Sequence, residues 1–194
     1  GENCGGDVSL SSDGNYVAVG SKLSDGLADD AGLVRIYEYG TSSGTWSQKG
    51  SNLYGKAAGD RSGSALSLSS DGSRVAIGAD RNDDGGANAG HVRVYEYATG
   101  MTDWSQLGSG IIGEAAVDFS GRSVSLSGDG SRLAPITMMA GEPVRGMCEF
   151  TSIPPVATLG PNSGPTLTGR LPGTRAAFPY LCRVMGLLLP LVRF

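Results

Sequence analysis

The chain repeats its own sequence with a period of 58 residues, and this period constrains its fold more than any other feature. Two units and the beginning of a third align without a gap over the first 134 of the 194 residues. Repeats of this length are typical of proteins in which each unit is one small supersecondary structure packed against its neighbours. The aligned positions include glycines, aspartates and aromatic residues: Gly5, Gly63 and Gly121; Asp13, Asp71 and Asp129; Tyr37 and Tyr95; Trp46 and Trp104. We therefore assign residues 1–60 to a first repeat, 61–118 to a second, and 119–134 to the start of a third.

Each unit reads as four β-strands. In the second unit, apolar and polar residues alternate in short runs separated by Asp, Gly and Ser, which is the pattern of half-buried strands joined by tight turns. The predicted strands are 64–69, 74–79, 91–97 and 104–111. Ser70-Asp71-Gly72 forms the first turn, where Gly supplies the positive φ that a tight hairpin requires.

A four-stranded antiparallel meander cannot bury both of its faces, but copies stacked face to face can. The small residues of the first strand suit a crowded inner position, and the larger Tyr and Trp residues fall on the third and fourth strands. We therefore predict an all-β fold, a partial β-propeller of four-stranded antiparallel blades with an irregular C-terminal tail; a β-sandwich is the alternative. Trp46 and Trp104 are expected to fill the space between blades, with exposed sugar-stacking as the alternative role.

The composition changes sharply after residue 134. All nine prolines lie at residue 135 or later, and the net charge is −7 over residues 1–134 but +3 over residues 135–194. If the tail is back-translated and read one frame away, residues 146–152 permit His-Val-Arg-Val-Tyr-Glu-Tyr, the sequence of residues 91–97. We interpret residues 135–194 as an aberrant, frame-shifted, Pro-rich tail and predict irregular structure there, with a short helix at 181–189, because Pro is disfavoured inside sheets. A genuine Pro-rich linker or interaction tail is the alternative.

The stretches SALSLSSDGSRVAIGAD, NAGHVRVYEY and GRSVSLSGDGSRLA resemble FG-GAP repeats, the blades of integrin-α-type propellers. The resemblance covers residues 1–134. It implies a propeller in an extracellular or cell-surface protein, with ligands on one loop face. Many family members carry an Asp-x-Asp-x-Asp-Gly calcium loop between the first two strands, where this chain has only Ser70-Asp71-Gly72.

The loop from Asp80 to Gly90 is the best candidate site, because carboxylates and amide carbonyls on a Gly-rich loop are the ligands that calcium takes. Asp80, Asp83 and Asp84 are the candidate metal ligands, and a solvated loop without ligand is the alternative. In a propeller, the loops between second and third strands and those leading into the next blade open on one face. We therefore predict that a cation or a basic partner binds this face, and the predicted partner-binding residues are Asp25, Asp29, Asp30, Asp80, Asn82, Asp83 and Asp84.

No catalytic residues are predicted. His91, the only histidine, aligns with Leu33 and is expected to be a packing or edge residue. Arg35 and Arg93 project opposite to the flanking Val and Ile residues and are expected to pair with Glu38, Glu96 or neighbouring strands. The three cysteines show no metal-ligand spacing and no disulfide framework.

These features favour a non-enzymatic binding or adhesion module, a fragment of a larger propeller protein, with a protein or glycan partner. A calcium-stabilised structural propeller and a glycan-active propeller enzyme are the alternatives. No cofactor is predicted apart from calcium in the first of these alternatives. The net charge of −4 argues against a nucleic-acid partner. Residues 181–194 are apolar but too short to span a bilayer. Open blade faces are expected to make residues 1–134 marginally stable alone.

Overall fold

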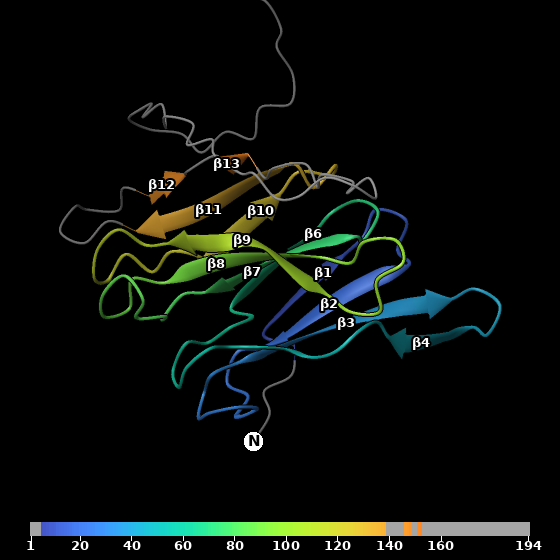
Figure 1. The fold of residues 1–194 in the computed structure, drawn as a ribbon, viewed down its shortest axis with the longest axis horizontal. Coiled ribbons are helices and arrows are strands. Elements are labelled where there is room, and N and C mark those ends of the chain that lie inside the picture. Colours follow the sequence, from blue (N-terminus) through green and yellow to red (C-terminus); the bar gives the residue numbers. More distant parts are fainter. Residues whose placement is uncertain (1–4, 139–145, 149–150, 153–194) are drawn as a thin grey trace, which may run out of the picture. The chain divides into compact units, whose positions relative to one another are not determined.

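The computed structural model describes residues 5–138, 146–148 and 151–152, and describes side chains up to residue 134. The chain divides into two units, 1–155 and 156–194, and every described residue belongs to the first. These residues form β-strands without a helix, arranged in three antiparallel sheets (Figure 1). No helix in this part of the chain is long and apolar enough to cross a membrane. The all-β prediction is therefore confirmed, whereas the helix predicted at 181–189 lies outside the described residues.

Each repeat forms one sheet, and strands within each sheet follow chain order. The first sheet contains β1 (Asp7–Leu10), β2 (Tyr16–Ser21), β3 (Leu33–Gly40) and β4 (Thr45–Gln48), with β5 (Leu53–Tyr54) also paired to β3. The second contains β6 (Ala65–Leu68), β7 (Arg74–Ala79), β8 (His91–Glu96) and β9 (Ser105–Ile112). The third contains β10 (Ser123–Leu126), β11 (Arg132–Met138), β12 (Gly146–Cys148) and β13 (Thr151–Ser152), the last two both paired to β11. The strands predicted for the second repeat agree with β6 to β9 to within one residue at every end.

The aspartate of each Ser-Asp-Gly or Gly-Asp-Gly turn is an internal hydrogen-bond acceptor. Asp71 accepts hydrogen bonds from the Ser69 hydroxyl at 2.6 Å and from the Ser73 backbone N–H at 3.0 Å, and Gly72 has φ +67°. Asp129 repeats this arrangement, and its hydrogen bonds, first that from Ser127, lower its pKa to about 2. The recurring aspartates therefore shape turns, as Asx-type side chains do.

The sheets pack face to face, so the second sheet is covered on both sides. Apolar side chains of the first and second sheets form one buried cluster: Ala18, Val34, Ile36, Leu53, Leu66, Leu68, Val75, Ile77 and Trp104. The alternate residues of β7 and β8 pack instead with the third sheet: Ala76, Val92, Val94, Leu126 and Leu133. Successive meanders stacked in this way form a partial β-propeller. Trp104 fills the space between two blades as predicted. For Trp46 the prediction is wrong, because this residue is 47% exposed and belongs to no buried cluster among the described residues.

Pairs of glycines set the close approach of neighbouring blades. A Cβ atom on Gly78 would lie 1.9 Å from the backbone oxygen of Gly121, and one on Gly20 would lie 2.4 Å from that of Gly63. Backbone atoms cannot move aside as a flexible side chain can. Gly63 and Gly121 also adopt φ of +86° and +85°, which favours glycine at both repeat positions.

The third sheet corrects the expectation that irregular structure begins at residue 135. Strand β11 continues to Met138, and Pro135 pairs with Val124 of β10. On the other side of β11, pairing with β13 ends at Leu133 and pairing with β12 begins at Ile136. Pro135 lies at that break, where its missing N–H interrupts no pairing on that side. Strands β12 and β13 fall within residues 146–152, which the shifted frame reads as a third strand.

Candidate binding site on the loop face

Backbone hydrogen bonds join the loop between β2 and β3 to the segment that leads into the second blade. The N–H groups of Gly59, Arg61 and Ser62 donate to the carbonyls of Asp29, Asp30 and Ala31 at 2.9, 3.2 and 2.9 Å. The next blade repeats the pattern, with Val117, Phe119 and Ser120 donating to Ala87, Asn88 and Ala89. The two loop types therefore open on the same face, as the sequence predicted.

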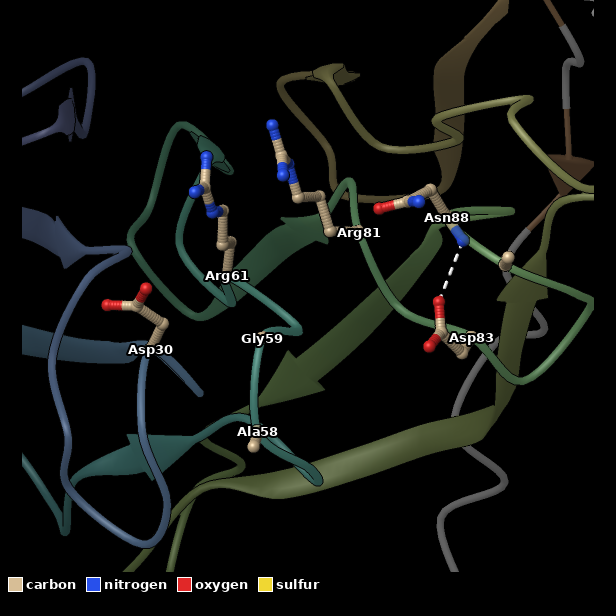
Figure 2. A pocket seen from close by; sticks show the side chains of 8 residues that line it. Asp30, Ala58, Gly59, Arg61, Arg81, Asp83 and Asn88 are labelled. Atoms are coloured by element: carbon tan, nitrogen blue, oxygen red, sulfur yellow. Dashed lines mark hydrogen bonds between the residues drawn. The ribbon is translucent and has the colours of Figure 1, made fainter.

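A pocket of about 280 Å³ lies between these loops. Its walls come from three segments: the β2–β3 loop, the segment 58–61 and the β7–β8 loop (Figure 2). The lining residues are Asp30, Ala58, Gly59, Arg61, Arg81, Asp83, Ala87 and Asn88. The pocket thus joins two successive blades, and its lining is mostly polar.

Two arginines supply the cationic groups of the pocket, beside the carboxylates of Asp30 and Asp83. The side chains of Arg61 and Arg81 extend from neighbouring segments toward the same side of the pocket (Figure 2). Within the described part of the chain, neither guanidinium forms an ion pair with Asp or Glu, whereas Arg74, for example, pairs with Glu96 at 2.8 Å. Two unneutralised guanidinium groups in one pocket attract an anion.

Two of the predicted partner-binding carboxylates each hold their own loop through one oxygen. Asp83 Oδ1 accepts the Asn88 N–H at 2.7 Å, and Asp25 Oδ1 accepts the Asp30 N–H at 3.0 Å. These bonds fix the left-handed conformations of Asn88 and Asp30, whose φ values are +54° and +51°. Of the predicted residues, the structure brings only Asp30 and Asp83 into the pocket.

The other predicted residues of the β7–β8 loop have separate roles. Asn82 is buried, donates to Asp60 Oδ1 at 3.0 Å and accepts from the Asp84 N–H, so it is not available to a partner. Asp84 pairs with Lys56 at 3.3 Å. One carboxylate oxygen of Asp80 is buried without a partner.

These carboxylates do not converge on one point. Among the described residues, no group of three or more His, Cys, Asp and Glu side chains could hold a metal ion. Because calcium takes six to eight oxygen ligands, Asp80, Asp83 and Asp84 do not form a calcium cage in this geometry. Calcium binding therefore stays a prediction, without support from the arrangement of these side chains.

A second polar cluster lies buried on the face of β8 that is turned toward the first blade. Arg93 donates from Nε to His91 Nε2 at 2.9 Å and from Nη1 to the Tyr95 hydroxyl at 3.1 Å. Burial, and then the charge of Arg93, lower the pKa of His91 from 6.5 to about 4. Arg93 was expected to pair with Glu38, Glu96 or neighbouring strands; Arg74 pairs with Glu96 and Lys49 with Glu38, so the two glutamates are not its partners. His91 is a neutral packing residue, as its alignment with Leu33 predicted.

Sequence reasoning missed the role of Arg61. Its repeat counterpart is Phe119, which carries no charge, and it lies on a linking segment without a strand pattern. Only the packing of one blade on the next brings Arg61 beside the β7–β8 loop. Arg81 lies in the loop that the sequence singled out, although the carboxylates, rather than Arg81, drew the prediction.

No protein-family model matches the chain, and neither does any curated protein sequence. Among solved structures, a candidate 6-phosphogluconolactonase from Bacteroides uniformis matches with a TM-score of 0.45 and 14% identity, over 74% of this chain and 38% of that one. The periplasmic gluconolactonase of Pseudomonas aeruginosa matches with a TM-score of 0.42 and 17% identity, over 67% of this chain and 35% of that one. This chain therefore spans little more than a third of either structure. Likenesses at these TM-scores do not indicate a function.

Proposed function

We propose that this chain is a non-enzymatic binding module of the propeller type and that its loop-face pocket binds an acidic sugar. The observation that carries the proposal is the pair of unneutralised guanidinium groups, Arg61 and Arg81, in one pocket between two blades. This reverses the sign of the partner expected from the sequence, because Asp84 pairs with Lys56 whereas Arg61 and Arg81 have no ion pair among the described residues.

The chemistry of the pocket fits a sugar that bears a carboxylate. A guanidinium fork binds a carboxylate through two parallel N–H donors. Sugar hydroxyls are donors as well as acceptors, and the carboxylates of Asp30 and Asp83 supply acceptors beside the two arginines. A ligand with one anionic group and several hydroxyls uses both kinds of side chain, whereas a simple anion meets repulsion from the two aspartates.

The loops that form the pocket are held in advance of binding. Backbone hydrogen bonds fix the segment around Arg61 to the β2–β3 loop, and Asp83 fixes the β7–β8 loop from within. A site that is ordered before the ligand arrives loses little conformational entropy on binding. Binding residues placed on loops of a rigid scaffold are typical of recognition modules.

The resemblance to FG-GAP repeats supports membership of that family and a place on the cell surface or outside the cell. A glycan-active enzyme remains the alternative class, and a hydrolase panel tests it. Such an enzyme uses a pair of carboxylates as acid and base, and Asp30 and Asp83 are the carboxylates that line the pocket.

The experiment compares binding to an array of uronate-bearing oligosaccharides with binding to matched sugars in which the carboxylate is reduced to an alcohol. We expect the wild-type chain to prefer the uronates by about tenfold or more, since a charge-assisted hydrogen bond contributes about 1.5–3 kcal/mol. Arg61→Ala with Arg81→Ala should remove that preference, and Arg132→Ala, which changes an exposed arginine on the third sheet, should not. Equal binding of acidic and neutral sugars by the wild type would overturn the proposal.

A further inference from the structure

The first sheet exposes a face whose counterpart in the second sheet is buried. Val8, Leu10 and Trp46 are 51%, 59% and 47% exposed. The residues 58 positions later, Leu66, Leu68 and Trp104, are 7%, 7% and 8% exposed. The repeat therefore places the same kind of apolar surface in both sheets, but among the described residues only the second sheet has a neighbour on that side.

The covered interface shows which chemistry fits such a face. In the second sheet, the N–H of Leu66 donates to Asp7 Oδ2 at 2.6 Å, and the N–H of Leu68 donates to the Ser9 hydroxyl oxygen at 2.9 Å. The indole of Trp104 donates to the Lys49 carbonyl at 2.8 Å. The cover is thus the opposite face of the preceding blade, with apolar side chains and acceptors in register.

Among the described side chains of the third sheet, β10 carries the next acceptor of this series. The N–H of Leu126 donates to the Ser67 hydroxyl at 2.9 Å, as Leu68 donates to Ser9. Ser125 of β10 is the next residue in this series, 58 positions after Ser67, and it is exposed. The Ser125 hydroxyl on the third sheet is therefore an acceptor that matches a donor on the first sheet, the N–H of Leu10.

We propose that the exposed face of β1–β4 is an interface for a second copy of this chain, whose third sheet packs on it head to tail. The contact would repeat the one between the first and second sheets, with Ser125 of one copy accepting from Leu10 of the next. Such a contact joins two different surfaces, so it closes into a ring or continues as a chain of copies. The inference is independent of the proposed sugar site, because none of its residues lines the pocket.

The first test is the mass of the full chain in solution, measured by sedimentation velocity over a hundredfold range of concentration. We expect the mass to rise with concentration, and Leu10→Lys to shift the midpoint by at least tenfold toward higher concentration. Leu27→Lys is the matched control, because Leu27 is 70% exposed on the β2–β3 loop, away from the face. A wild-type chain that stays monomeric throughout, or equal effects of the two variants, would overturn the proposal.

The second test establishes the head-to-tail geometry and does not depend on the stability of the Leu10 variant. Ser12 and Ser70 occupy the same repeat position in neighbouring blades, with hydroxyl oxygens 2.9 Å apart, and the Ser70 N–H donates to the Gly128 carbonyl at 2.8 Å. In a chain with Cys4, Cys148 and Cys182 replaced by Ser, oxidation of Ser12→Cys/Ser70→Cys should give a bond within one chain. Oxidation of Ser12→Cys/Gly128→Cys should instead link two chains, because these positions are two blades apart within one copy. Failure of the second pair to link chains while the first pair closes would refute the head-to-tail contact.

Discussion

His91 should make the stability of this protein fall as the pH drops from about 6.5 to about 4. Its imidazole is 2% exposed and accepts a hydrogen bond from Arg93 Nε, so protonation places two cations side by side. Asp84, whose carboxylate lies 3.8 Å from Nδ1, and Asp60 favour the protonated form, but burial, Arg93 and Lys56 oppose it and prevail. The pKa in the folded state is therefore lowered from 6.5 to about 4.

The sign follows from proton binding. Between these two pKa values the unfolded chain binds a proton at His91 and the folded chain does not, so low pH favours unfolding. The contribution is fully present above pH 6.5 and is lost as the pH falls to about 4. At about 1.4 kcal/mol per pH unit, the loss reaches about 3 kcal/mol of unfolding free energy.

Two measurements check this expectation. Because the chain has one histidine, NMR titration of its imidazole reports a single pKa, expected near 4 in the wild type. Urea unfolding of the wild type and of His91→Leu, the residue that the first repeat carries as Leu33, should give curves that diverge below pH 6.5. Arg93→Gln should raise the pKa of His91. An imidazole pKa near 6.5, or parallel pH dependence in the two proteins, would refute the reasoning.

Two further predictions concern the blade contact and calcium. Gly78→Ala should lower the unfolding free energy by about 3 kcal/mol or more, because the new Cβ meets the Gly121 backbone oxygen. This is at or beyond the upper end of the ordinary cost of overpacking. Gly6→Ala is the control in the same thermal melt and should change the unfolding free energy little, because its Cβ would lie 3.6 Å from its nearest neighbour. The calcium prediction is tested in the same melt. A rise in melting temperature that EDTA reverses and that Asp83→Ala with Asp84→Ala abolishes would support it, and an unchanged melting temperature would contradict it.

The strands were predictable because local alternation determines them. The pattern around Ser70-Asp71-Gly72 predicts a hairpin, and β6 and β7 form it with Ala65 opposite Gly78 and Leu68 opposite Val75. The end of the ordered sheet was not predictable from proline content. A single Pro135 fits a strand where the pairing on one side is interrupted, and only the pairing partners reveal that break.

The position of the candidate site was predictable from the sequence, but the charge of the ligand that it suits was not. Two-residue alternation and loop length locate the loop face, whereas the use of each carboxylate depends on contacts within and between loops. Asp84 meets Lys56 from a segment 28 residues earlier, and Asn82 turns inward to Asp60. Asp84 is thereby paired with a cation and Asn82 is turned away from the pocket, whereas Arg61 and Arg81 line it without an ion pair among the described residues, and composition alone cannot show this.

On the loop face, equivalent positions of the two repeats share a left-handed backbone conformation although their side chains differ. Arg61 and Phe119 occupy the same repeat position with φ of +58° and +50°, and Asp30 and Asn88 do so with +51° and +54°. The contact between such a loop and the segment that leads into the next blade therefore has the same backbone conformation in both repeats. The chemistry of this contact can change by side-chain substitution alone, without a change in loop conformation. A protein built from such units can change its ligands at one contact between blades without altering the others. Phe119→Arg is the single substitution that would place an arginine at the position equivalent to Arg61.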